Sequence, residues 1–241
     1  MNGRRLHVPE GMNYEEFKAK YLTPSKSDGK INQDKSLTLA EKARLTTPKT
    51  KVNECVTFDQ LKHYLASTYN LSIDSSLEAL NFDSVRSAAS GVESVMKEFP
   101  KALGALKGLT VESGNYVMAT NYSGGIIKFN PLEFQISRNL AYGGAHEGGH
   151  ILEKALIDRN GGGINDWNEC TFAKAIVNEA IVNLLTDEKM TSEKILRGVS
   201  AYSLKNDSEC LGEAVRDFVA KGEKSLILSK EIWRLLKREL G

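Results

Sequence analysis

The residues best suited to chemistry in this chain form the pattern H-E-x-x-H, at His146-Glu147-Gly148-Gly149-His150. On an α-helix, residues four apart share a face, so both imidazoles can reach one metal ion. The glutamate between them lies close enough to take a proton from a water on that ion. The pattern predicts a zinc-dependent hydrolase, in the first place a peptidase, with Glu147 as general base. The alternative is an amphipathic surface helix that carries two histidines without a metal.

Two glycines lie inside this predicted helix, Gly148 and Gly149. In a helix interior each costs roughly 1 kcal/mol relative to alanine. We expect this cost to be tolerated because another helix or a substrate approaches the backbone closely. Asn160 and the glycine run 161–163 predict the end of the helix.

A catalytic zinc site usually has a third protein ligand and keeps one position for water. No histidine follows His150, so this ligand must be a carboxylate or a cysteine. Glu209, Glu213 and Asp217 recur every four residues and would form one stripe on a helix. One of these carboxylates could bind the metal while the next orients a ligand histidine. The same stripe could instead be a solvated acidic face.

Tyr202, Glu209 and Glu213 follow the motif by about fifty to sixty residues. Together with H-E-x-x-H, this spacing resembles the gluzincin class of zinc metallopeptidases. It is most similar to the lethal-factor-like toxin peptidases, in which a tyrosine precedes the ligand glutamate by seven residues and a second glutamate follows four later. The resemblance implies that His146, His150 and Glu209 bind Zn²⁺ in a zinc metalloendopeptidase.

The same resemblance implies that Tyr202 donates a hydrogen bond to the developing oxyanion, and that Glu213 supports the ligands from behind. Ala214 and Arg216 also fit the family pattern, whereas Gly212 stands where the family usually has alanine. In a thermolysin-like register, Glu213 would be the ligand and Asp217 its support. We prefer Glu209, because only that register also accounts for Tyr202.

The elements predicted around these residues indicate an α+β fold. Strands are predicted at 109–111, 116–120 and 126–129, with a hairpin turn between the last two, and helices at 57–67, 82–97, 167–190, 192–204 and along the acidic stripe, before a last helix capped by Ser229. Helix, small sheet and H-E-x-x-H helix is the order found in zincin folds. The resemblance therefore implies a zincin-like fold, with a small and mostly antiparallel sheet and a helical C-terminal subdomain. Its strand nearest the cleft would pair with an extended peptide.

The N-terminal region differs from the rest in composition. Residues 1–22 resemble the end of phage minor head proteins, in which a proline, a small residue and a methionine-x-tyrosine tail follow the main domain. Residues 23–54 are polar and read as a linker, and residues 55–241 form the expected peptidase domain. The resemblance implies association with a phage or prophage and with phage head proteins. A phage structural or host-interaction module with a structural or inactive zinc site is the alternative function.

Composition narrows the partners and the compartment. The formal net charge is +1, which gives no electrostatic case for binding nucleic acid or a membrane surface. No apolar run approaches the roughly 20 residues of a membrane span, and no apolar signal core is present. Cys55, Cys170 and Cys210 form no C-x-x-C pair, so we expect neither a disulfide framework nor a structural zinc. We expect a peptide or protein substrate, in the bacterial cytoplasm or on a virion.

Overall fold

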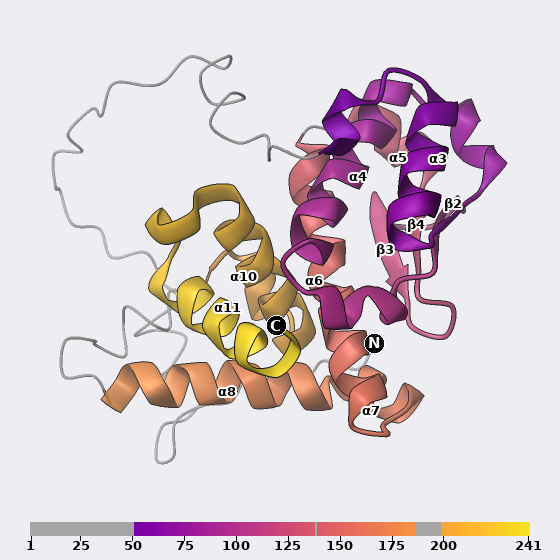
Figure 1. The fold of residues 1–241 in the computed structure, drawn as a ribbon. Helices are drawn as coiled ribbons and strands as arrows, with labels where there is room; N and C mark the ends of the chain where they lie inside the picture. Colours follow the sequence, from indigo (N-terminus) through magenta and orange to yellow (C-terminus); the bar gives the residue numbers. More distant parts are fainter. Residues whose placement is uncertain (1–50, 138, 187–198) are drawn as a thin grey trace, which may run out of the picture.

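The computed structural model describes residues 51–137, 139–186 and 199–241 (Figure 1). The predictions for residues 1–22, and for the linker up to residue 50, lie outside these ranges. The described chain begins with the 3-10 helix η2 (Lys51–Glu54), inside the region expected to be linker. Val52 in η2 is buried, and its N–H donates to the Glu93 carboxylate at 3.0 Å. Residues 51–54 therefore belong to the packed body.

The helices before the sheet follow their sequence signals. Helix α3 (Phe58–Tyr69) begins after Thr57, whose hydroxyl accepts the Gln60 N–H, as the capping pattern predicts. Helix α4 (Phe82–Met96) coincides with the predicted helix 82–97 within one residue. The 3-10 helices η3 (Ser75–Ala79) and η4 (Pro100–Ala105) flank α4.

The sheet is mixed, so the prediction of a mostly antiparallel sheet is wrong. Its four strands are β1 (Ser72–Ile73), β2 (Gly108–Val111), β3 (Met118–Asn121) and β4 (Ile126–Phe129), in the order β1-β2-β4-β3. The hairpin β3–β4 is antiparallel as predicted, but β1–β2 and β2–β4 are parallel. The chain runs from β2 to the far edge to form β3 and returns as β4 in between, so β2 and β4 point the same way. Two-residue β1 is too short to show a periodic pattern.

Helix α6 (Leu140–Arg159) follows the short helix α5 (Pro131–Ile136) and runs between two groups of elements (Figure 1). It packs against α4 on one side and against α10 (Asp207–Lys221) on the other. A Cβ added at Gly148 would lie 2.9 Å from the Val95 side chain of α4, and one at Gly149 would lie 2.8 Å from Gly212 Cα of α10. The prediction that something approaches these glycines is confirmed, and on both sides it is a helix.

The C-terminal half is helical: α7 (Ile164–Asn168), α8 (Thr171–Thr186), η5 (Tyr202–Leu204), α10, η6 (Gly222–Lys224) and α11 (Ile227–Leu240). Two predictions here are wrong. The single helix 167–190 is broken, because Cys170 adopts a left-handed backbone (φ 54°) between α7 and α8. Ser229 does not cap the last helix, which begins two residues earlier; its hydroxyl instead donates to Asp217.

Tyr202 lies in η5 rather than in the expected helix 192–204, of which residues up to 198 lie outside the described ranges. The three cysteines are buried, and none forms a disulfide among the described residues. In the same ranges, no helix combines the length and apolar character that crossing a membrane requires.

Candidate metal centre

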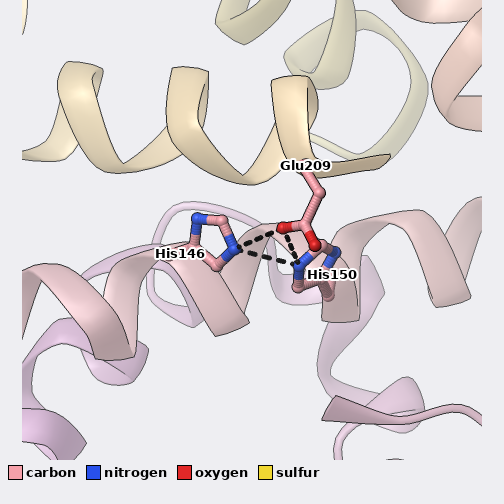
Figure 2. Close-up of side chains that lie close together, drawn as sticks. All are labelled: His146, His150 and Glu209. Atoms are coloured by element: carbon pink, nitrogen blue, oxygen red, sulfur yellow. Dashed lines mark hydrogen bonds and ion pairs between the residues drawn. The ribbon is translucent and has the colours of Figure 1, made fainter. Parts of the chain in front are cut away.

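His146 and His150 lie one turn apart on α6, as the motif predicts (Figure 2). Their Nε2 atoms are 3.1 Å apart, and both side chains are largely buried. The rings meet nearly edge to face, at 82°. Two imidazole nitrogens therefore converge on one point beside the helix.

Glu209 reaches the same point from α10, the helix on the opposite side in Figure 2. Its Oε2 lies 3.1 Å from His146 Nε2 and 3.5 Å from His150 Nε2. The Asn206 side chain accepts the Glu209 N–H at 2.9 Å and starts α10, which places Glu209 in the first turn of the helix. Among the described residues, His146, His150 and Glu209 form a group whose donor atoms all lie within 4.8 Å of one another.

Glu213 lies behind His146, one turn further along α10. Its Oε1 is 3.0 Å from His146 Nδ1 and 2.8 Å from Arg216. Asp217 faces away from the histidines and accepts the Leu226 N–H and the Ser229 hydroxyl at 2.9 and 2.7 Å. The acidic stripe therefore divides into Glu209 beside both Nε2 atoms, Glu213 beside one Nδ1, and Asp217 at the junction with α11.

Sequence reasoning missed the partners of His150. Its Nδ1 lies 3.1 Å from the Ser208 hydroxyl, which donates a short hydrogen bond to Glu153. Glu153 is fully buried on α6 and lies 3.8 Å from the same Nδ1. Two signals were present: Glu153 is three residues after His150, on the same face, and Ser208 precedes Glu209.

Glu147 is held by the sheet. Its Oε2 accepts the Thr120 hydroxyl of β3 at 2.7 Å, and the Thr120 hydroxyl also lies 3.3 Å from the Glu147 carbonyl oxygen. This contact joins residues 27 apart in sequence, so local pattern could not reveal it.

Tyr202 is half exposed and lies beside Glu209. Its hydroxyl donates to Glu209 Oε1 at 3.1 Å, and Lys205 Nζ lies 2.8 Å from the same oxygen and 3.1 Å from the hydroxyl. One oxygen of Glu209 thus faces the histidines while the other is bound by Tyr202 and Lys205. Lys205 had no role assigned from sequence.

These side chains open into a cleft of about 350 Å³. The edge strand β3 forms one wall through Met118, Ala119 and Thr120. Trp167 and Asn168 of α7, with η5 and the start of α10, form the other. The residues to which the sequence assigned a catalytic or ligand role, His146, Glu147, His150, Tyr202 and Glu209, all line this cleft, whereas Glu213 does not.

The carboxylates dominate the electrostatics. Burial lowers the pKa of His150, but the nearby carboxylates of Glu153 and Glu209 outweigh burial and raise that pKa to about 10. Burial likewise lowers the pKa of His146, and Glu209 and Glu213 raise it above its ordinary value. Burial raises the pKa of Glu213, yet contact with His146 brings it down to about 2. The carboxylates therefore stabilise positive charge on the two histidines, or on a cation bound between them.

The donor set and the charges fit a divalent cation. Two imidazole nitrogens and one carboxylate oxygen are a common ligand set of catalytic zinc. Glu147, Glu153, Glu209 and Glu213 supply four carboxylates, whereas Lys205 and Arg216 supply two permanent cations paired with them. One Zn²⁺ would neutralise the remaining negative charge of the four carboxylates.

No protein-family model matches this chain, and neither a curated protein nor a solved structure does.

Proposed function

We propose that this chain is a zinc-dependent metalloendopeptidase with a zincin-like fold, of the gluzincin type. The observation that carries the proposal is the convergence of His146 Nε2, His150 Nε2 and Glu209 Oε2 in one cleft. Glu147 lines the same cleft, and Glu213 supports His146 from behind. The histidines lie on α6 and the glutamates on α10, and the two helices face each other. Moving any of these residues by two positions along its helix would turn its side chain away from the others.

The reaction proposed is hydrolysis of a peptide bond. Bound zinc would supply a Lewis acid that polarises the scissile carbonyl and lowers the pKa of water from about 15.7 toward 7. Glu147 accepts the proton of the attacking water and passes it to the leaving amine. The Thr120 hydroxyl keeps the Glu147 carboxylate turned toward the cleft.

We propose that Tyr202 donates to the oxyanion while Lys205 holds Glu209. A substrate oxygen would replace Glu209 Oε1 as the acceptor of the Tyr202 hydroxyl. Lys205 would keep its bond to that Glu209 oxygen, so the other oxygen stays toward the histidines. Such donors to a developing oxyanion contribute about 3 kcal/mol in typical enzymes.

The position of β3 supports a peptide as substrate. β3 is one of the two edge strands of the described sheet and also a wall of the cleft. An extended peptide can add to such an edge through main-chain hydrogen bonds. Pairing of this kind recognises the middle of a chain rather than its end, and for this reason we propose an endopeptidase.

We also propose association with a phage or prophage, and this part of the proposal rests only on the resemblance of residues 1–22 to the end of phage minor head proteins. A phage structural or host-interaction module is the competing function. A structural zinc site in such a module needs no general base, so the module would work equally well without the Glu147 carboxylate.

The test is turnover of a peptide library by Glu147→Gln. We expect this variant to keep its zinc and its fold and to lose cleavage, because the amide matches the shape of the carboxylate but cannot accept the proton. His63→Ala is the matched control, since His63 is exposed on α3, and it should cleave normally. Equal turnover by Glu147→Gln and wild type would contradict the proposed mechanism.

A further inference from the structure

The far side of His150 is built differently from that of His146. His146 Nδ1 faces a carboxylate directly, that of Glu213 at 3.0 Å. His150 Nδ1 lies 3.8 Å from the nearest Glu153 oxygen, which is too far for a hydrogen bond. The Ser208 hydroxyl fills the gap, 3.1 Å from Nδ1 and in a short hydrogen bond to Glu153.

We infer that Ser208 and Glu153 are positioning residues that fix His150 in the orientation and tautomer a metal ligand needs. The inference rests on the proposed zinc site and adds two residues to it. Neither residue belongs to the motif or to the tyrosine–glutamate pattern.

The direction of the hydrogen bonds determines which nitrogen of His150 carries the hydrogen. A carboxylate can only accept, so the Ser208 hydroxyl donates its single proton to Glu153. The serine oxygen can then only accept from His150, and Nδ1 must bear the hydrogen. Nε2 is then the nitrogen whose lone pair can bind a metal in place of a proton, and it faces His146 Nε2 and Glu209.

Burial makes this direction hard to reverse. Glu153 is fully buried, and its second oxygen has no hydrogen-bond partner among the described residues. Ser208 is thus the hydrogen-bond donor on which the buried carboxylate depends. The serine also comes from α10 while His150 and Glu153 come from α6, so the relay ties the ligand to the helix that brings Glu209.

The experiment is the zinc dissociation constant of the full chain, measured by competition with a chromophoric chelator. Ser208→Ala should bind zinc about 10 to 100 times more weakly than wild type, as is typical when a hydrogen-bond partner of a ligand histidine is removed. Ser229→Ala is the matched control: Ser229 is also a buried serine that donates to a buried carboxylate, Asp217, but it lies on α11. It should bind zinc as wild type does, whatever it costs in stability.

Ser208→Ala leaves Glu153 buried without a donor, and the variant could lose its fold for that reason alone. The double variant Ser208→Ala/Glu153→Met also removes the buried charge, because methionine replaces the glutamate with an apolar side chain of similar size. We expect it to fold with a melting temperature near that of wild type and still to bind zinc at least tenfold more weakly. This separates positioning from stability.

Wild-type affinity in both variants would overturn the inference and leave the peptidase proposal standing. Failure of the wild-type chain itself to bind zinc would instead overturn the metal centre. If the wild-type chain binds zinc but cleaves no peptide of the library, the peptidase proposal alone is contradicted.

Discussion

At the scale of single residues, the two oxygens of Glu209 have separate tasks. Oε2 faces both histidine Nε2 atoms, and Oε1 is held by Tyr202 and Lys205. Burial raises the pKa of Glu209, but its bonds to His146, His150 and Lys205 outweigh burial and hold that pKa far below its usual range. Glu209 therefore stays ionised, as a metal ligand must.

Tyr202→Phe tests the proposed oxyanion contact. The variant should keep its zinc and lower kcat by about 100-fold, because one donor to the developing charge is lost. The measurement is steady-state cleavage of a library-derived peptide at saturating zinc. Tyr116→Phe is the control, since Tyr116 lines the same cleft but its hydroxyl donates to the Glu112 carbonyl. An unchanged kcat in Tyr202→Phe would remove Tyr202 from the mechanism.

At the scale of elements, glycines set the distance between the helices that carry the site. Gly144 of α6 faces α4 so closely that an added Cβ would lie 1.9 Å from the Ala88 carbonyl oxygen. On the other side of α6, Gly149 meets Gly212 of α10. Gly149 thus lets α10, which carries Glu209, approach the histidines, while Gly144 lets α6 approach α4. These close contacts explain why residues with poor helix propensity occupy this helix.

Gly144→Ala should destabilise the protein by about 1–3 kcal/mol, because the new methyl group collides with backbone rather than with a movable side chain. Chemical denaturation followed by circular dichroism measures this free energy of unfolding. Gly104→Ala is the matched control, since a Cβ there meets no atom within 4 Å. It should change stability by no more than about 0.5 kcal/mol. Equal stability of the two variants would show that the helices can move apart freely.

The junction of α10 and α11 depends on Asp217. This buried carboxylate bonds to Leu226 N–H, the Ser229 hydroxyl and Lys221. Burial raises the pKa of Asp217, but these partners, with Lys221 first, lower it below the ordinary value of 3.8.

A group with a lowered folded-state pKa stabilises the protein above its unfolded pKa and loses that effect as the pH falls below it. Asp217→Asn should therefore be less stable than wild type by about 1–3 kcal/mol at pH 7. The difference should shrink progressively below pH 3.8. Urea denaturation of both proteins from pH 7 to pH 3 measures it. A difference that does not depend on pH would rule out the carboxylate charge as its cause.

At the scale of the whole molecule, sequence reasoning succeeded where the signal was local. The motif, the acidic stripe and the capping residue Thr57 each fix side chains within one helix, and helical geometry then places them. The hairpin β3–β4 was readable for the same reason. The order of the strands could not be read from the sequence, because β2 pairs with β4 although β3 lies between them in the sequence.

The missed site residues follow the same rule. Thr120 reaches Glu147, and Ser208 reaches His150, from elements far away in sequence. The break at Cys170 was hidden because a left-handed residue that is not glycine carries no propensity signal.

We propose above all that His146 and His150 from α6 share one zinc ion with Glu209 from α10. Metal content after dialysis, measured by elemental analysis on wild type, Glu209→Gln and Asp217→Asn, tests it most directly. Asp217 belongs to the same acidic stripe but faces away from the histidines, so its amide variant controls for the loss of one stripe charge. We predict one zinc per chain in wild type and in Asp217→Asn, and a large loss in Glu209→Gln. Absence of zinc from the wild type, or full zinc in Glu209→Gln, would contradict the account.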